Sequence, residues 1–319
     1  MKGLFITTAL AAMTLTGLAA ADPVNVSDFA LAQRIADKVA AGEPLNLYVS
    51  YQDVSNEFAP QIRAGVERAA AEDGVNASFI GPVGSDADAQ INEIESLMET
   101  MDGLAISSVS TDALAPLIDR VLAAGIPVIT YNTDNPDSDR LVFAGQDLIQ
   151  SGREAGKLMC DLHPEGKVLI LTLDAAAQWS LDREQGAREA LAECPANEVV
   201  ATINTGSDPQ EMYASIENAM LANPDVTGLL SLECCTTPAA GSWVERSGRD
   251  DVTIVGFDLL DQTVDYVADG TIAATIDQAP DAQGFAAVDL LVRYLHGEDI
   301  DNLDTGVGIY TADNIGELQ

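Results

Sequence analysis

The sequence predicts an α/β fold of two similar lobes, each a parallel sheet flanked by helices. The chain has 319 residues, more than a single hydrophobic core usually organises, so two lobes are expected. Short β-rich apolar runs alternate with segments of helical period, which is the pattern of a parallel sheet covered by helices. About ten such runs are present, and because ten strands would make a large open sheet, two sheets of about five are expected.

The expected elements follow one another in a repeating order of strand, polar strand end, helix and short Gly or Pro turn. Many of the helices begin after Asp, Ser or Thr and stop at Gly or Pro, as caps and breakers require. The expected strands are residues 45–51, 77–83, 103–109, 126–132, 141–146, 167–173, 199–205, 227–233, 252–258 and 272–278. The expected helices include residues 27–41, 57–71, 87–100, 112–124, 149–162, 182–193, 209–222 and 282–296.

The amino terminus predicts export. Lys2 precedes an apolar run over residues 4–18 and the small-residue cleavage pattern Ala19-Ala20-Ala21. A membrane anchor is the alternative, but threonines interrupt the run, which is shorter than the roughly 20 apolar residues that a span needs. We therefore expect residues 1–21 to be a cleaved signal peptide, with no lipid-accepting cysteine after it and no later membrane-spanning stretch. The mature protein is expected to be free in the periplasm, without direct membrane insertion.

The charge balance is strongly acidic, with 51 Asp and Glu against 15 Lys and Arg and a formal net charge of −36. Such a chain repels nucleic acid and anionic membrane surfaces, so neither is expected as a partner. Solubility explains the acidic excess as well as any function does. The cysteines and histidines show none of the spacings typical of zinc sites, and no metal or cofactor is expected.

Polar residues follow several expected strands, at the carboxyl ends where ligands bind in parallel sheets. Asn and Asp at such positions also cap helices, and this is the alternative for each one taken singly. The candidate site segments are Ser50-Tyr51-Gln52, Tyr131-Asn132-Thr133-Asp134, Glu233-Cys234-Cys235, Phe257-Asp258 and Asp277-Gln278.

Several motifs recur in a fixed order between about residue 45 and about residue 300. The combination of Gly256-Phe257-Asp258 with the run Asp-Gly-Thr-Ile-Ala-Ala-Thr-Ile at 269–276 is specific, whereas one short motif alone would be weak. The other matching segments are residues 125–130, 144–147, 183–186, 277–278 and 297–298. In this order and spacing the sequence resembles the ribose-type periplasmic binding proteins, the sugar-binding branch of the receptors that serve ABC importers.

The resemblance implies a type I periplasmic binding protein, with two lobes joined by three crossovers and closing on a sugar. It places residues 22–146 and 279–303 in the first lobe, and residues 147–278 and 304–319 in the second. It also implies a monomer that binds a small neutral polyhydroxylated ligand and delivers it to the membrane permease of an ABC importer.

In the first lobe, the resemblance aligns Asn56 and Phe58 with a polar contact and a stacking ring. Asn132 stands where the family commonly has an aspartate, and Thr133 where an arginine often follows. We expect Asp134 to supply the missing carboxylate. The departure from the family pattern makes ribose itself a doubtful ligand.

In the second lobe, Arg183 matches an arginine of the family that begins the first long helix. Asp258 and Gln278 match a cleft acceptor and a hinge amide. A sugar needs such planar polar groups for its hydroxyls and an aromatic ring for its C–H face, and Trp179 is the candidate ring. The alternative for Arg183 is a surface ion pair with Glu184 or Asp182. The alternative for Trp179 is a structural role, with its ring packed inside the protein.

The segment at residues 232–240 is similar to the autoinducer-2 receptors of the same superfamily, with Glu233 where those have an aspartate. Oxidised to each other, Cys234 and Cys235 would form a flat disulfide that stacks on the ligand. Adjacent cysteines often stay reduced, because a vicinal bond distorts the peptide. The four cysteines allow three pairings in an oxidising compartment, and a bond from Cys234 or Cys235 to another cysteine is the alternative to the vicinal one. Cys160 and Cys194 end two successive helices of the same lobe, which favours a structural disulfide between them.

Two other functions share parts of these observations. A signalling receptor for autoinducer-2 or a sugar would have the same fold and cleft. A hydrolase would need paired carboxylates, for which Asp134, Glu233 and Asp258 are the candidates. The sequence has no Gly-x-Ser-x-Gly turn and no phosphate loop, so binding without catalysis is expected.

Overall fold

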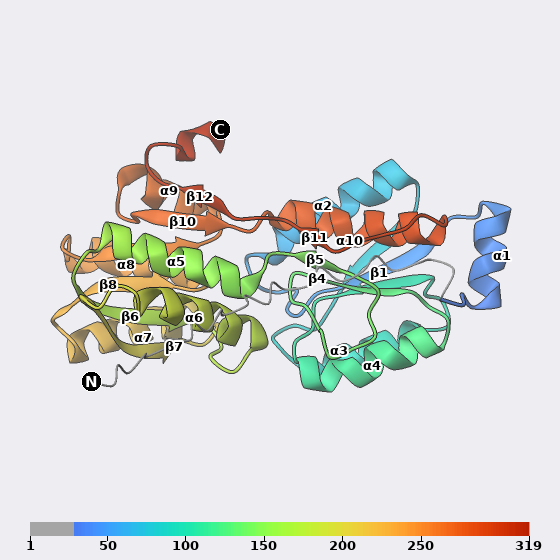
Figure 1. The fold of residues 1–319 in the computed structure, drawn as a ribbon, viewed down its shortest axis with the longest axis horizontal. Coiled ribbons are helices and arrows are strands. Elements are labelled where there is room, and N and C mark those ends of the chain that lie inside the picture. Colours follow the sequence, from blue (N-terminus) through green and yellow to red (C-terminus); the bar gives the residue numbers. More distant parts are fainter. Residues whose placement is uncertain (1–28, 319) are drawn as a thin grey trace, which may run out of the picture.

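The computed structural model of the protein describes residues 29–318, in which the chain forms two lobes, each around one six-stranded sheet (Figure 1). The expected signal peptide lies outside the described residues. The fold class is confirmed, with one more strand in each sheet than expected. No helix within the described range is long and apolar enough to cross a membrane.

The sheet of the first lobe has the strand order β11-β5-β4-β3-β1-β2, and all of these strands run parallel. Helices α2 and α10 pack together on one face, and α3 and α4 cover the other (Figure 1). The strands are β1 (Asn46–Ser50), β2 (Asn76–Ile80), β3 (Gly103–Ile106), β4 (Val128–Tyr131), β5 (Phe143–Gly145) and β11 (Leu303–Asp304). The helices are α1 (Gln33–Ala41), α2 (Ala59–Asp73), α3 (Ala87–Leu97), α4 (Thr111–Ala123) and α10 (Pro280–Leu295).

The sheet of the second lobe has the order β12-β10-β9-β8-β6-β7, parallel except for β12 at its edge. The strands are β6 (Gly166–Thr172), β7 (Asn197–Asn204), β8 (Val226–Ser231), β9 (Thr253–Phe257), β10 (Ala274–Asp277) and β12 (Gly308–Tyr310). The helices are α5 (Leu148–Leu162), α6 (Gln178–Leu191), α7 (Pro209–Ala222), α8 (Thr236–Ser247) and α9 (Asp261–Asp269), followed by a short 3-10 helix (Ile315–Leu318).

Both faces of the second sheet are buried, and β6 shows why its sequence is apolar throughout. Leu169 and Leu171 pack in one cluster with α7, α8 and α9, whereas Val168 and Ile170 pack in another with α5 and α6. Successive side chains of a strand point to opposite faces, so a strand covered on both sides needs apolar residues at every position.

The ten strands expected from the sequence are all present, with ends that differ by a few residues. Strands β11 and β12 were not expected, because they have only two and three residues and their side chains are largely exposed. Helices α8 and α9 were not among the expected helices, and within the described residues the expected helix at 27–41 begins only at Gln33.

The chain passes between the two sheets three times. The first crossover joins β5 to α5, the second joins β10 to α10, and the third joins β11 to β12. Helix α10 therefore belongs to the core of the first lobe although it follows the last parallel strand of the second. We call these three segments the crossovers.

Candidate functional site

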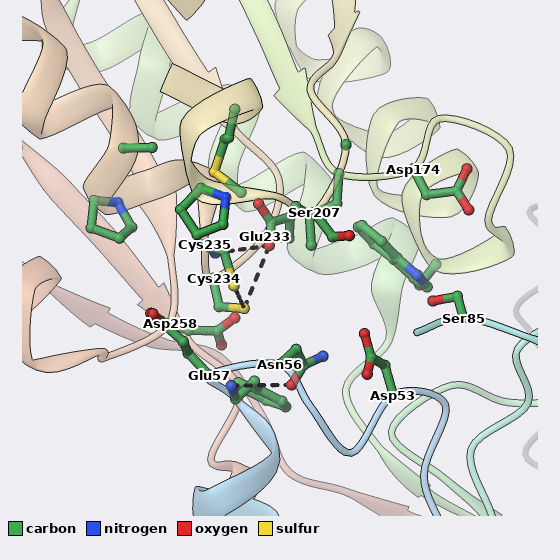
Figure 2. A pocket seen from close by; sticks show the side chains of 18 of the residues that line it. Asp53, Asn56, Glu57, Ser85, Asp174, Ser207, Glu233, Cys234, Cys235 and Asp258 are labelled. Atoms are coloured by element: carbon green, nitrogen blue, oxygen red, sulfur yellow. Dashed lines mark hydrogen bonds between the residues drawn. The ribbon is translucent and has the colours of Figure 1, made fainter. Parts of the chain in front are cut away.

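A cavity of about 770 Å³ lies between the two lobes and is lined by residues from both. Figure 2 shows Asp53, Asn56 and Ser85 of the first lobe across the cavity from Asp174 and Ser207 of the second. Its walls carry the polar strand ends, as the topology of parallel sheets requires. The expected site residues that line it are Tyr51, Asn56, Phe58, Asn132, Trp179, Arg183, Glu233, Cys234, Asp258 and Gln278.

Aromatic rings form part of the first-lobe wall. Tyr51 follows β1 and stacks on Phe79, with ring centroids 5.9 Å apart, and its ring lies 6.4 Å from that of Phe58. Burial raises the pKa of Tyr51, which keeps the phenol protonated. The Asn56 side-chain oxygen accepts the backbone N–H of Ala59 at 2.9 Å, at the start of α2. Asn56 therefore caps a helix and also lines the cavity.

Arg183 is buried in the second lobe, with 3% of its surface exposed. Its Nη1 donates to the Leu232 carbonyl at 2.9 Å, its guanidinium lies 4.3 Å from the centre of the Phe257 ring, and its Nε has no partner. Burial lowers its pKa, but an arginine remains charged. The alternative of a surface ion pair is wrong, since Glu184 pairs with Arg188 instead. Arg183 thus brings a positive charge and an unused donor to the cavity wall.

Close packing of two helices fixes the position of Arg183. A side chain at Gly152 on α5 would collide with the Arg183 backbone, and one at Gly186 on α6 would collide with the Ile149 carbonyl. Only glycine allows the two helix backbones to approach so closely. Trp179 lies in the first turn of α6, earlier than the expected helix start, and lines the cavity half-buried.

Asp258 follows β9 and is 1% exposed. Its Oδ1 accepts from Gln278 Nε2 at 2.9 Å, and it makes no ion pair with a basic side chain of the described residues. Burial raises its pKa to about 7, and the opposing effects of Arg183 and Gln278 are smaller. Asp258 is therefore a buried carboxyl group with acceptor capacity that the protein leaves unused.

Glu233 lines the cavity but also serves as a helix cap. Its carboxylate accepts the backbone N–H groups of Cys235 at 2.8 Å and of Thr236 at 2.5 Å, at the start of α8. The capping alternative considered for such residues therefore applies to Glu233. A carboxylate bound in this way has less capacity left for a ligand than Asp258 has.

Cys234 and Cys235 are free thiols whose sulfurs lie 3.0 Å apart at the cavity wall. Hydrogen bonding to Cys235 and burial raise the pKa of Cys234, so this thiol is protonated. The stacking disulfide is absent from this structure and stays a prediction. Mass spectrometry of the unreduced protein tests it.

The predicted disulfide between Cys160 and Cys194 is confirmed. The bond closes a loop across 34 residues of the second lobe, and we expect reduction to lower the melting temperature. Cross-linking such a loop restricts the unfolded chain, which corresponds to about 2–4 kcal/mol of stability. Differential scanning calorimetry of the C160S/C194S variant measures the loss. An unchanged melting temperature would show that the bond does not stabilise the fold.

Asp134 does not line the cavity, and the expectation that it supplies a carboxylate there is wrong. Its Oδ2 accepts from Arg140 Nη2 at 2.5 Å, and its Oδ1 accepts from Thr130 Oγ1 at 2.5 Å. Arg140 neutralises this carboxylate within the first lobe.

Several lining residues were not among the expected site residues. Asp53 and Asp174 follow β1 and β6 closely, so the rule of polar strand ends could have found both. Arg246 and Gln262 lie on α8 and α9, two helices that were not expected. Five carboxylates and two arginines line the cavity, which makes it acidic overall and unfavourable for anionic ligands.

Residues 47–299 match the model of the periplasmic binding protein domain. The chain is 29% identical over 282 residues to the xylose/arabinose-binding protein of Sulfolobus acidocaldarius, covering 82% of this chain and 69% of that protein. It is 26% identical over 276 residues to the ribose import binding protein of Escherichia coli, covering 86% and 92%.

Among solved structures, an ABC transporter solute binding protein from Burkholderia graminis, in complex with D-arabinose, has a TM-score of 0.81 and 27% identity. The alignment covers 85% of this chain and 96% of that one. The local similarity of residues 232–240 to autoinducer-2 receptors gains no support from these relatives. The family match includes every residue that lines the cavity and most of both sheets, with strands β11 and β12 lying beyond residue 299, and the chain belongs to the family of the periplasmic binding protein domain.

Proposed function

We propose that this chain is an exported receptor that captures a small neutral sugar or polyol between its lobes and delivers it to the permease of an ABC importer. Its relatives are named for binding xylose, arabinose and ribose, and a structural neighbour holds D-arabinose. Closing of the lobes would bury the ligand and create the surface that the permease recognises. Residues 1–21 would direct the chain to the periplasm, where it would act as a monomer.

The observation that carries the proposal is the pair of incompletely used polar groups, Asp258 and Arg183. A buried carboxyl with spare acceptor capacity and a buried guanidinium Nε without an acceptor are costly unless a ligand binds them. A sugar hydroxyl both donates and accepts, so neighbouring hydroxyls can satisfy both groups. An amino acid would bring a sixth carboxylate into a cavity that already has five.

The rings of Phe58 and Trp179 line the cavity on opposite lobes. Aromatic faces bind the C–H face of a sugar ring, while the polar groups take its hydroxyls. Binding of this kind leaves the ligand chemically unchanged, so the receptor is not an enzyme. An unaltered ligand recovered after incubation would support this.

A thermal-shift screen tests the proposal. We expect a pentose, hexose or polyol to raise the melting temperature, because a ligand that binds only the folded state stabilises it by mass action. At a ligand concentration 100 times Kd the gain is about 2.7 kcal/mol. Amino acids and sugar acids serve as controls and should give no shift. A shift confined to those acids would refute the proposal.

A further inference from the structure

A cluster of buried amides lies where the crossovers meet the cavity. Its members are Asn132, Gln278 and Gln283, exposed by 6%, 4% and 0%. Asn132 and Gln278 line the cavity, whereas Gln283 does not. Gln283 lies in the first turns of α10, directly after the second crossover. It is thus a fully buried amide that the proposed ligand would not touch.

The Gln283 side chain joins the first lobe to two crossovers. Its Oε1 accepts from Asn132 Nδ2 at 2.9 Å, at the end of β4. Its Nε2 donates to the Gln278 carbonyl at 2.8 Å and to Thr305 Oγ1 at 3.3 Å. Thr305, in the third crossover, donates to the same Gln278 carbonyl at 2.9 Å. One side chain therefore holds the second crossover between the first lobe and the third crossover.

The same cluster reaches the ligand-binding group of the second lobe. Gln278 Nε2 donates to Asp258 at 2.9 Å, and Gln278 Oε1 accepts weakly from Asn132 and Gln283, each at 3.4 Å. Asn132 in turn accepts from Ser107 Oγ at 3.1 Å, deeper in the first lobe. A continuous hydrogen-bonded path thus runs from Asp258 through the crossover into the first lobe.

The backbone conformation supports a functional role for this cluster. Among the described residues, the non-glycine residues with positive φ are Asn132 at 60°, Asp258 at 67° and Ala279 at 54°. Asn and Asp adopt this region more readily than other residues, but alanine is disfavoured there. Ala279 follows Gln278, whose carbonyl Gln283 holds. Such conformations persist only where surrounding contacts enforce them, and they concentrate at functional sites.

We propose that Gln283 is a positioning residue that couples ligand binding at Asp258 and Gln278 to the angle between the lobes. The inference rests on the proposed function, because it concerns how that same site closes. Gln283 holds the Gln278 carbonyl and so fixes the backbone of the second crossover. A ligand that binds Asp258 and Gln278 therefore pulls on a crossover that has a single conformation. Without Gln283, the ligand still meets its contacts but the crossover no longer has one preferred conformation.

The test uses Gln283→Met, which keeps the side-chain length and removes both hydrogen-bonding ends. Thr305→Val, which removes the other donor to the Gln278 carbonyl, is a second variant in case the first folds poorly. The matched control is Gln90→Met. Gln90 is equally buried in the first lobe and bonds to Ser50 and Ser107, but none of its bonds reaches a crossover.

The first readout needs no ligand. We expect amide hydrogen exchange of Gln283→Met to quicken by about tenfold at residues 277–283 and 303–308, as loss of one or two net hydrogen bonds predicts. Gln90→Met should leave exchange at these residues unchanged. If residues 277–283 and 303–308 exchange at the wild-type rate in both Gln283→Met and Thr305→Val, the inference is overturned. This outcome does not depend on which ligand the protein binds.

The second readout uses the sugar or polyol that raises the wild-type melting temperature most. We expect Gln283→Met to bind it about tenfold more weakly by calorimetry, and its radius of gyration in X-ray scattering to decrease less at saturation. If Gln283→Met binds the ligand with the wild-type Kd and its radius of gyration decreases as much as that of the wild type, the coupling is refuted. The proposed function would not be affected by that result. Failure of every sugar and polyol to bind the wild-type protein would refute the proposed function, while hydrogen exchange would still decide the role of Gln283.

Discussion

Replacing Asp258 with Asn should weaken ligand binding by about 30- to 150-fold and at the same time make the ligand-free protein more stable at neutral pH. The loss of affinity corresponds to about 2–3 kcal/mol, the value of a hydrogen bond to a charged group. The stability gain arises because burial raises the carboxyl pKa from 3.8 to about 7. Asn keeps an oxygen for Gln278 Nε2 and tolerates positive φ.

The direction of the pH dependence follows from this raised pKa. The unfolded carboxyl ionises near pH 4, so the folded state has no electrostatic cost at Asp258 below that pH. The cost grows between pH 4 and pH 7 and is complete above pH 7, where it reaches about 4 kcal/mol. Chemical denaturation should therefore find Asp258→Asn more stable than the wild type at pH 8 and similar to it at pH 4. Equal stability at pH 8 would contradict the assignment.

Ligand affinity should depend on pH in the opposite sense. Ligand hydroxyls that donate to Asp258 favour its ionised form, so affinity should fall as the pH drops below about 7. The Asp258→Asn variant should lack this dependence. Calorimetric titrations between pH 5.5 and 8.5 compare the two proteins. A wild-type affinity that is constant over this range would show that the ligand does not donate to Asp258.

Replacing Arg183 with Met should weaken binding by at least about 30-fold, because truncating a buried charged partner costs about 2–5 kcal/mol. The cavity would lose its buried guanidinium, and the Leu232 carbonyl would lose its donor. The substitution is therefore expected to lower the stability of the protein as well as its affinity. A melting curve must accompany each titration, so that the two effects can be separated.

Arg188→Met is the matched control for Arg183→Met. Arg188 lies on the same helix, is exposed, and pairs with Glu184 away from the cavity. Exposed pairs of this kind contribute about 0–1 kcal/mol, so binding should remain at the wild-type level. If Arg183→Met also keeps wild-type affinity, Arg183 does not contact the ligand.

The sequence predicted the fold well where an element's own residues determine it. Strands such as β6 are apolar throughout because both faces are buried, and this pattern is visible without a structure. Helix α8 was not expected, since Pro238 lies in its first turn and Gly241 further along lowers helical propensity. A side chain at Gly241 would collide with the Tyr266 ring, so tertiary packing explains the glycine.

The site was predictable to the extent that topology brings strand ends together. Asp258 and Gln278 follow neighbouring strands, and the sheet order alone places them side by side. Asp134 also follows a strand, but its role depends on Arg140, a partner that no strand-end rule identifies. Gln283 lies within a helix, where the rule of polar strand ends does not apply, and only the path of the chain at the crossover reveals its contacts.

The three crossovers also determine when the first lobe can fold. Helix α10 and strand β11 complete the core and sheet of that lobe, yet they come near the end of the chain. As the polypeptide emerges from the ribosome or a membrane channel, residues 29–145 lack these partners until almost the whole chain has appeared. Contacts between distant segments form slowly, so the first lobe should remain unfinished throughout synthesis. The export that we propose for this chain would benefit from this delay, because a chain that crosses a membrane unfolded must not fold beforehand.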